Sequence, residues 1–193
     1  MKITVCNFKG GTGKTSIALN LALTMKHAIV SNDIYSPLGN VLDKKKFIKL
    51  EPDQDLPELP KKYDIIFDLG GHIDPRAIAA IDQSDWVIVP VTRDFIDIQV
   101  SINCIGELQE HTKKIIVIAN RTVKGELKAI EKAVRNFFKF PVFEIKKSKA
   151  LPAIFKEKKS IRDMVLEGGL KSYHYKSVTE QFDAVIKHME KKK

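Results

Sequence analysis

The sequence lacks any apolar run that approaches the ~20 residues needed to span a lipid bilayer. It also leaves no room for a signal peptide, because Met1-Lys2 leads straight into the apolar segment Ile3–Cys6. We therefore expect a cytoplasmic protein with no membrane-spanning segment.

Cysteine is scarce, with only Cys6 and Cys104 in 193 residues. Thiols stay reduced in the cytosol, so we expect no disulfide between these two residues. Cys6 falls within an apolar strand-like segment and Cys104 within a helical pattern. Both are therefore predicted to be small buried apolar side chains.

The chain also lacks internal repeats and an interdomain linker, and its only low-complexity segment is the terminal lysine run. At 193 residues it is long enough to bury its own core. Its apolar and charged fractions are ordinary for a globular protein. We expect a single domain over residues 1–193.

The net charge of +9 is confined to the last third of the chain. Residues 1–122 contain 15 Lys and Arg and 15 Asp and Glu, whereas residues 123–193 contain 18 basic residues against nine acidic ones. A one-sided basic surface is typical of a polyanion partner, either nucleic acid or an anionic membrane. The alternative is a lysine-rich solvated surface with no partner.

Apolar segments with the length of buried strands alternate with segments of helical periodicity. The predicted strands are Met1–Asn7, His27–Ser31, Asp64–Leu69, Trp86–Val91, Lys114–Ala119 and Val142–Ile145. The predicted helices are Lys14–Lys26, Pro75–Ile81, Ile96–His111, Lys124–Phe140, Ala150–Lys156, Ser160–Glu167 and Ser177–Lys191. Residues 42–50 fit a short helix or a short strand. The alternation predicts an α/β fold, a doubly wound and mostly parallel sheet with helices on both faces and its ligand beyond the carboxyl ends of the strands.

A glycine-rich stretch, Lys9-Gly10-Gly11-Thr12-Gly13-Lys14-Thr15, joins the first predicted strand to the first predicted helix. Glycines let backbone N–H groups turn inward around an anion, and a helix N-terminus adds partial positive charge at the same place. The pattern therefore predicts a phosphate-binding loop. Lys14 would lie along the β- and γ-phosphates, and the Thr15 hydroxyl would hold Mg²⁺.

The loop departs from the pattern G-x-x-x-x-G-K-[ST], because Phe8 occupies the position of the first glycine. It reads K-G-G-x-G-K-[ST], and this deviant Walker A form resembles the ParA/MinD ATPases, a group that includes the nitrogenase iron protein and arsenical-pump ATPases. The resemblance implies a P-loop ATPase that binds ATP and Mg²⁺. Its ATP-binding loop residues would be Gly10, Gly11, Thr12, Gly13, Lys14, Thr15 and Ser16.

Two acidic residues stand at predicted strand ends. Asp68 occupies the position of a Walker B acid, which would reach Mg²⁺ directly or through water. ParA-like proteins end the second strand in D-x-D, and the triplet Ser31-Asn32-Asp33 keeps only one of those acids. Another alignment places Asp33 on the first acid and Tyr35 on the second. In both alignments Asp33 is the candidate that orients the attacking water.

Lys9 is the signature lysine of the family, where it crosses a dimer interface to the partner's nucleotide. The resemblance thus implies a homodimer that forms on ATP binding, with Lys9, Lys14 and Asp33 as catalytic residues. Asn120 matches the family position that hydrogen-bonds the adenine edge, and an amide that presents a donor and an acceptor suits ATP over GTP. The family usually has Ile-Pro after the last strand, whereas this chain has Ile145-Lys146.

Three members of the group serve as alternatives. An iron-protein-like electron donor would need cysteines on loops, which the placement of both cysteines argues against. A MinD-like positioning ATPase would end in a lipid-binding amphipathic helix. The chain ends in an apolar stripe that fits either such a helix or a core-facing one, formed by Phe182, Val185, Ile186 and Met189.

The third alternative, a ParA-like partition ATPase, accounts best for the charge asymmetry. The resemblance is to short ParA proteins without an N-terminal helix-turn-helix region, which bind DNA non-specifically as ATP dimers on the nucleoid and leave site-specific binding to a ParB-like or adaptor partner that stimulates hydrolysis. Basic residues in the C-terminal part would contact DNA phosphates. The candidates are Lys146, Lys147, Lys149, Lys156, Lys158, Lys159 and Arg162. A nucleotide-binding regulatory module with little turnover remains a further alternative.

Overall fold

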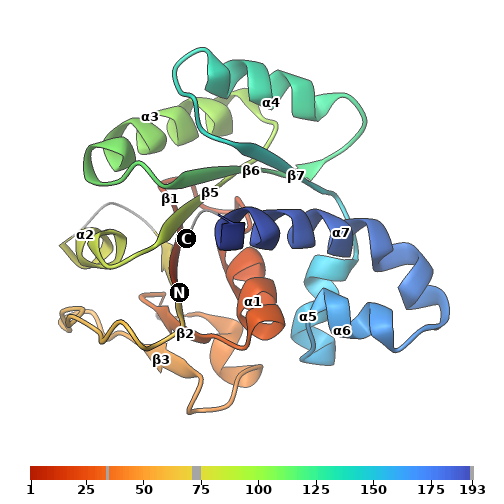
Figure 1. Ribbon diagram of the computed structural model, residues 1–193, viewed down its shortest axis with the longest axis horizontal. Helices are drawn as coiled ribbons and strands as arrows, with labels where there is room; N and C mark the ends of the chain where they lie inside the picture. The colour runs from red at the N-terminus through yellow and green to blue at the C-terminus, as the bar shows by residue number, and fades with distance from the viewer. Residues whose placement is uncertain (34, 71–74, 192–193) are drawn as a thin grey trace.

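The computed structural model describes residues 1–33, 35–70 and 75–191, and this part of the chain forms a seven-stranded sheet (Figure 1). The strand order is β3-β2-β4-β1-β5-β6-β7, and every neighbouring pair is parallel. The strands are β1 (Lys2–Asn7), β2 (Ala28–Ser31), β3 (Phe47–Lys49), β4 (Ile65–Gly70), β5 (Trp86–Val91), β6 (Ile115–Thr122) and β7 (Val142–Lys146). The predicted fold class is confirmed.

Helices cover both faces of this sheet (Figure 1). One face carries α1 (Lys14–Met25), α5 (Ala150–Glu157), α6 (Ile161–Leu166) and α7 (Gly169–Lys191). The other face carries α2 (Pro75–Asp82), α3 (Phe95–His111) and α4 (Glu126–Arg135). A short 3₁₀ helix, η1 (Pro37–Asn40), follows β2.

The alternation of side chains along each strand divides the core into two layers. In β5, Trp86 and Ile88 pack with the layer around α1, whereas Val87, Val89 and Val91 pack with the layer around α3. Successive side chains of a strand point to opposite faces, so a strand that is covered on both sides must be apolar at every position. This is why the central strands read as continuous apolar runs in the sequence.

The connections place the glycine-rich loop at the point where the sheet changes its winding direction. From β1 the chain passes through α1 to β2 on one side, and from β5 it passes through α3 to β6 on the other. β1 and β5 are neighbours, and their crossovers leave in opposite directions. Such an arrangement opens a crevice at the carboxyl ends of the two strands. The loop therefore emerges where an open α/β sheet binds its ligand.

Two of the C-terminal helices pack against α1, the helix that follows the glycine-rich loop. α5 and α6 pack against α1, and the Asn20 side chain in α1 accepts a 2.9 Å hydrogen bond from the backbone N–H of Ile161. The Ser160 hydroxyl caps α6 by accepting from the Asp163 N–H. The last third of the chain is thus anchored to the helix that follows the loop.

Residues 42–50, which fit a helix or a strand in the sequence, contain the short edge strand β3, which pairs with β2. Two helices differ clearly from the expected bounds. α4 ends at Arg135 instead of Phe140, and the residues after it form a turn in which the Phe138 N–H donates to the Val134 carbonyl at 2.9 Å before the chain enters β7. α7 begins at Gly169, eight residues before the expected Ser177.

Both cysteines are free and buried, as expected. Within residues 1–33, 35–70 and 75–191, no helix is both long and apolar enough to cross a membrane.

Candidate nucleotide-binding site

The glycine-rich loop closes over the end of β1 in a conformation that depends on two glycines. Gly11 has φ 77° and Gly13 has φ 94°, in the left-handed region that side chains disfavour. A Cβ on Gly13 would lie 2.4 Å from Asn120 Nδ2. Gly13 is therefore required both for its backbone angle and for the close approach of Asn120.

The Lys14 side chain lies along the loop rather than in solvent. Its Nζ donates a 3.0 Å hydrogen bond to the Lys9 carbonyl oxygen. Burial lowers the pKa of Lys14, while the charge of Asp68 acts in the opposite direction. An ammonium that is partly desolvated and held at the loop is suited to receive a phosphate group.

Thr15 and Asp68 meet directly beside the loop. β1 and β4 are neighbours, with Val5 opposite Asp68, so the carboxylate emerges next to the start of α1. Burial raises the pKa of Asp68 from 3.8 to about 6, and the hydrogen bond from Thr15 and the charge of Lys14 oppose this rise. One carboxylate oxygen, Oδ2, is buried and has no hydrogen-bond partner among the described residues.

These two residues fit a magnesium ion. Hard cations prefer carboxylate and hydroxyl oxygens, and the unpartnered Oδ2 of the buried Asp68 carboxylate carries a desolvation cost which a cation would relieve. Mg²⁺ usually takes one or two protein oxygens and completes its shell with water and nucleotide phosphates. The sequence-predicted pair is thus brought together with the chemistry that the ion needs.

Asp33 lies at the end of β2 but faces a turn. It is exposed, and its Oδ1 accepts a 2.9 Å hydrogen bond from the Tyr35 backbone N–H. Its charge still raises the pKa of Asp68, which places it within electrostatic reach of the metal pair. The neighbouring Asn32 instead joins β2 to β4, with Oδ1 accepting from the Gly70 N–H at 3.0 Å.

Asn120 stands at the far side of the loop, near the end of β6. Its Nδ2 donates a 2.7 Å hydrogen bond to the Thr12 carbonyl, and its Oδ1 is buried with no partner among the described residues. The amide therefore braces the loop with one of its two N–H groups and leaves its buried oxygen as an unpaired acceptor. The sequence predicts a donor and an acceptor towards the base, and the structure shows one N–H engaged by the loop instead.

Lys9 is paired with an acidic residue of the same chain. Its Nζ lies 3.3 Å from Asp97 Oδ1, and the other carboxylate oxygen of Asp97 accepts a 2.5 Å hydrogen bond from the Thr92 hydroxyl. Asp97 lies in the first turn of α3. The Lys9 side chain is 39% exposed, so this pair sits at the surface beside the loop.

A pocket of about 460 Å³ opens between the loop, the end of β5 and the end of β6. This volume lies within the roughly 300–1,000 Å³ of small-molecule sites. Sequence reasoning missed several residues of its wall, among them Arg121, whose guanidinium donates to the Gly11 carbonyl at 3.0 Å. The position of Arg121 directly after Asn120 at a strand end was the available signal. Its lining residues are Lys9, Gly10, Gly11, Thr92, Arg93, Asp94, Asp97, Asn120, Arg121, Val123 and Lys147.

The seven basic candidates have different neighbours in the fold. Lys147 lines the pocket beside the loop, while Arg162 pairs with Asp183 at 2.6 Å and lines a different pocket that also includes Met1. Lys159 pairs with Glu167. The Lys146 ammonium lies 3.9 Å from Glu144. The remaining candidates are Lys149, at the N-terminus of α5, Lys156, within it, and Lys158, at its C-terminus.

Comparison with known proteins places this geometry in context. The model of the CobQ/CobB/MinD/ParA nucleotide binding domain matches residues 3–161. No curated protein matches the sequence. MinD from Pyrococcus horikoshii OT3 complexed with Mg-ADP has a TM-score of 0.71 at 17% identity, with 97% of this chain and 98% of that chain covered.

Two further solved structures are similar in fold. A protein from Borrelia burgdorferi B31, named as a plasmid partition protein and bound to AMPPNP, has a TM-score of 0.67 at 16% identity, covering 97% of this chain and 98% of that one. A variant of Cyanothece McdA in complex with ATP has a TM-score of 0.67 at 14% identity, covering 95% and 94%. Together with the family match over residues 3–161, the fold and the loop show that this chain belongs to the CobQ/CobB/MinD/ParA family of nucleotide-binding domains.

Proposed function

We propose that the protein is a Mg²⁺-dependent ATPase of the ParA type, which forms a homodimer around two ATP molecules and binds DNA non-specifically in that state. The observation that supports the nucleotide chemistry is a pair of buried oxygens, Asp68 Oδ2 and Asn120 Oδ1, which have no hydrogen-bond partner among the described residues. Buried polar atoms are almost always satisfied in folded proteins. A metal on one side and a base on the other would satisfy both.

The free Asn120 oxygen supports adenine as the base. The N6 amino group of adenine is a hydrogen-bond donor, whereas guanine carries an acceptor oxygen at the corresponding position. One N–H of Asn120 Nδ2 is bonded to the Thr12 carbonyl, whereas the buried Oδ1 has no partner among the described residues and is the acceptor available to a base. An acceptor facing the base edge attracts adenine and repels guanine.

Phosphate binding, metal binding and orientation of the attacking water would fall to different residues of the site. Lys14 and the loop amides would hold the phosphates, and Thr15 with Asp68 would hold Mg²⁺, which neutralises charge that develops on the phosphate oxygens during transfer. Asp33 would help to orient the attacking water. Its engagement with the Tyr35 N–H means that the β2–η1 turn must adjust for this role.

Lys9 would supply positive charge to the nucleotide of the partner subunit. A lysine provided from the other subunit makes hydrolysis depend on dimer formation, and the partner protein that triggers hydrolysis would be a ParB-like or adaptor protein. In the monomer Lys9 is bonded to Asp97, so dimer formation would exchange one carboxylate contact for a phosphate contact.

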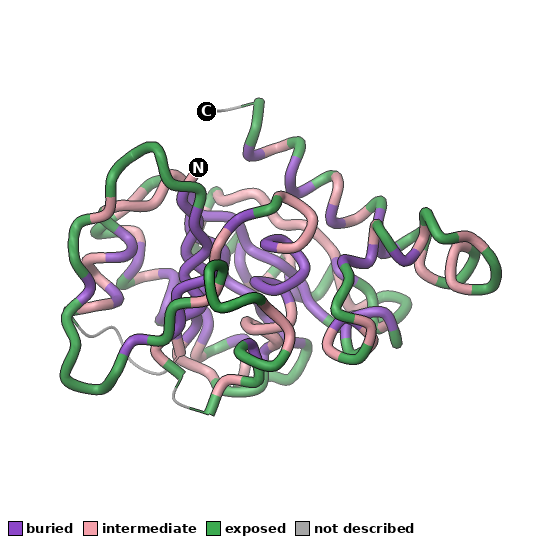
Figure 2. The backbone as a smooth tube through the Cα atoms, turned by 90° about the horizontal axis from the view of Figure 1, so that it is seen from below, coloured by how far each residue is buried: buried purple, intermediate pink, exposed green. Residues whose placement is uncertain are grey.

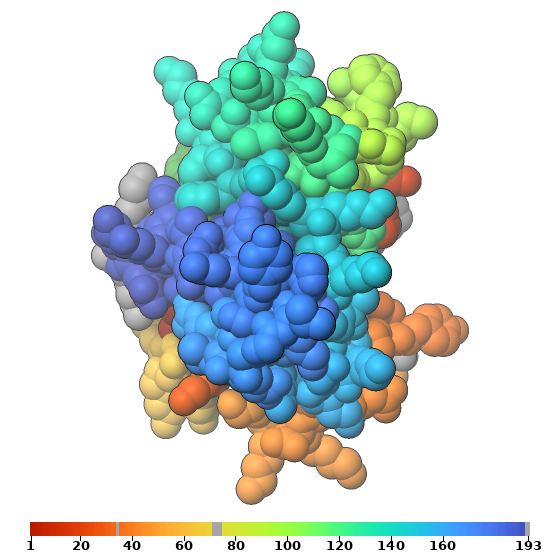
Figure 3. All heavy atoms as spheres, turned by 90° about the vertical axis from the view of Figure 1, so that its right-hand side faces the viewer, coloured from red at the N-terminus to blue at the C-terminus, as the bar shows by residue number. Residues whose placement is uncertain are grey.

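The DNA surface would be formed by the last third of the chain. Figure 3 shows that residues of this part make up most of one face of the molecule. The acid-free segment Lys146–Ala150 contributes three lysines at the carboxyl edge of the sheet, beside the nucleotide pocket. Lysines there would contact phosphates through counterion release, with no sequence preference.

The decisive experiment measures duplex DNA binding and subunit association with ATP, with ADP and without nucleotide. Wild type should form dimers and bind DNA only with ATP, and Lys14→Ala should lose both. Lys9→Ala should retain ATP binding yet fail to hydrolyse it. Tight DNA binding that is independent of nucleotide and unchanged in Lys14→Ala would contradict the ATP-controlled mechanism.

A MinD-like membrane role is the second candidate, and the end of α7 is the place to test it. Phe182, Val185, Ile186 and Met189 are all buried in the core layer around α1. A helix whose apolar stripe is packed against its own domain has no free face for lipid. Binding to anionic vesicles that requires this stripe would favour the membrane role instead.

A further inference from the structure

The first two turns of α7 extend beyond the protein core. The buried residues of this helix begin at Val178, and residues 169–177 contribute none. Figure 2 shows the end of α7 farthest from the C-terminus standing clear of the body, in pink and green. A helical stretch without a fully buried side chain gains less from tertiary packing, which normally stabilises helices in proteins.

This extension exposes large apolar side chains. Leu170 is 79% exposed and Tyr173 is 83% exposed, and their spacing of three residues places them on one side of the helix. Leu166, at the end of α6, is 77% exposed. We call these three residues the apolar ridge. The three residues fall within eight positions of the chain, on either side of the α6–α7 turn, and clustered exposed apolar residues are typical of interaction sites.

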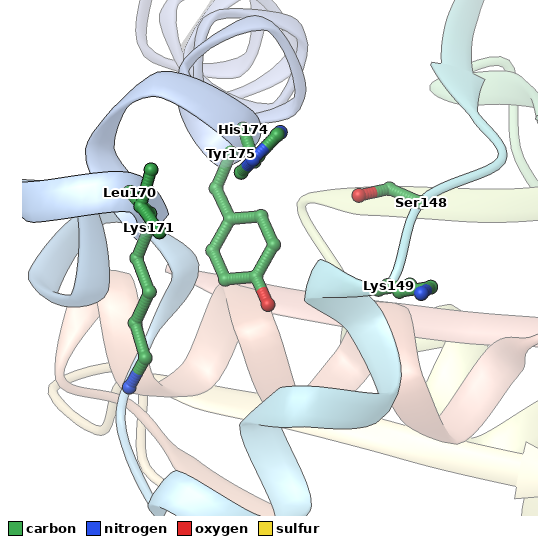
Figure 4. Close-up of a pocket in the computed structure, with 6 residues that line it drawn as sticks. All are labelled: Ser148, Lys149, Leu170, Lys171, His174 and Tyr175. Atoms are coloured by element: carbon green, nitrogen blue, oxygen red, sulfur yellow. The ribbon is translucent and has the colours of Figure 1, made fainter.

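A pocket of about 400 Å³ lies beside the ridge, between the extension of α7 and the turn that follows β7. Figure 4 shows the Tyr175 ring projecting from α7 into this space, with Lys171 on one side and Ser148 on the other. The Tyr175 ring is partly buried and packs against the core. The lining residues are Ser148, Lys149, Leu170, Lys171, His174 and Tyr175.

The two walls of this pocket contain no acidic residue. Segments 146–150 and 169–177 together carry five lysines and neither Asp nor Glu. Lys171 pairs with Glu157 of α5 at 2.9 Å. No carboxylate among the described residues lies within 4.0 Å of the Lys149 ammonium. The walls are therefore basic, and a complementary partner must be acidic.

We propose that this pocket is the docking site for an acidic segment of another protein, which inserts one apolar side chain against Tyr175 and places carboxylates on Lys149 and the lysines around it. The ridge of Leu166, Leu170 and Tyr173 would pack against the apolar face of the same segment. An aromatic floor with a charged rim is the usual anatomy of a protein–protein interface.

Two other occupants explain less of this surface. Lys149 also belongs to the proposed DNA surface, but a phosphate backbone makes no contact that requires three exposed apolar side chains or a concave apolar pocket. A lipid surface would bury the protruding ridge, but it would leave the recessed Tyr175 pocket unfilled. Only a peptide chain that carries both acidic and apolar side chains matches the ridge, the pocket and the charge together.

The docking site is adjacent to the nucleotide pocket along the chain. Lys147 lines the nucleotide pocket, and the next two residues, Ser148 and Lys149, line the docking pocket. A ligand in one pocket therefore acts on a segment that borders the other, which is the physical basis for a coupling free energy. Coupling to nucleotide rests on the proposed function, whereas docking itself does not.

The test uses a fluorescent peptide of eight glutamates with one central leucine, titrated with the full chain without nucleotide or DNA. Its affinity for wild type should fall roughly tenfold or more with Leu170→Asp and with Lys149→Glu. Phe137→Asp and Lys44→Glu are the matched controls, because both alter exposed residues on other elements, and they should bind as wild type does. Replacing the leucine with serine should weaken binding by a similar factor.

Three results would overturn docking at this pocket. Equal affinity of Leu170→Asp and wild type would place the peptide elsewhere, and equal affinity of the leucine and serine peptides would mean a simple polyanion surface. Phosphatidylserine vesicles that bind wild type but not Leu170→Asp, with no peptide binding, would assign the ridge to membranes. If the peptide binds but affinity is the same with ATP and ADP, docking stands and only the coupling to nucleotide fails.

Discussion

The Lys9 ammonium and the Asp97 carboxylate are 3.3 Å apart within one subunit, and this contact competes with any role of Lys9 in a second subunit. The Thr92 hydroxyl donates a hydrogen bond to Asp97 Oδ2 and so holds the carboxylate in the orientation that contacts Lys9. A lysine that must reach a partner's nucleotide has first to leave this carboxylate.

Replacement of Asp97 by Asn should therefore raise ATP-dependent dimer formation. A partly exposed ion pair contributes about 0.2–1 kcal/mol, and a dimer would break one such pair in each subunit. Loss of both pairs should therefore lower the dissociation constant of the ATP dimer by up to about thirtyfold. Sedimentation velocity with a slowly hydrolysed ATP analogue measures the constant. Asp94→Asn is the matched control, since Asp94 is exposed in the same pocket and makes no capping bond. A weaker dimer in Asp97→Asn would show that Asp97 helps Lys9 rather than restraining it.

Asp68 should make the nucleotide-free protein less stable as the pH rises. Its pKa is raised from 3.8 to about 6 in the fold, so between these values the folded state binds a proton that the unfolded state has released. Stability therefore falls as pH increases through this window, and the cost at pH 7.5 is on the order of 2–3 kcal/mol.

Asp68→Asn removes this titration. The variant should unfold at higher urea than wild type at pH 7.5, and the difference should shrink towards zero below pH 4. Urea melts at several pH values provide the measurement, and Asp82→Asn, an exposed acid at the end of α2, serves as control. A variant that is less stable than wild type at pH 7.5 would mean that hydrogen bonds to the carboxylate outweigh its burial.

Gly13→Ala should be far more harmful than Gly10→Ala. The added methyl at Gly13 meets Asn120 Nδ2 at 2.4 Å and the residue keeps a positive φ, whereas a Cβ at Gly10 meets nothing within 4 Å. We expect Gly13→Ala to cost about 1–3 kcal/mol of stability and Gly10→Ala well under half of that. Thermal melts of both variants without nucleotide give the comparison. Equal losses would show that the loop relaxes to admit the methyl group.

Asn120→Ala should reduce affinity for ATP more than affinity for GTP. The substitution removes both the acceptor offered to the base and the bond that braces Thr12, so ATP binding should weaken about tenfold or more. Isothermal titration with ATP and GTP separates the two contributions, because only the lost brace affects both nucleotides. An equal loss for the two nucleotides would remove Asn120 from base recognition.

Local patterns predicted most of this fold because the central strands are buried on both faces. A strand such as Trp86–Val91 is apolar at every position, and the structure has it with those bounds. The start of α7 was missed for the opposite reason. Residues 169–176 include no fully buried side chain, so no apolar periodicity marks them as a helix.

Site residues that lie in short sequence motifs could be predicted, whereas those identified only by contacts between distant parts of the chain could not. The glycine-rich loop and Asp68 could be read from short motifs at strand ends. Asp97 and Arg121 could not be predicted, because only the folded structure brings them to Lys9 and to the Gly11 carbonyl, respectively. The seven basic candidates were near each other in sequence, yet Arg162 lies in a different pocket from Lys147.

Lys9 takes part in two contacts through different groups. Its backbone carbonyl accepts a hydrogen bond from the Lys14 ammonium, which would bind a phosphate in the same subunit, and its side chain is proposed to contact the nucleotide of the other subunit. Once a phosphate captures Lys14, the Lys9 carbonyl loses its cation and the residue becomes freer to move. We therefore expect nucleotide binding in each subunit to release Lys9 for contact with the other subunit, so that two nucleotide-free subunits do not associate.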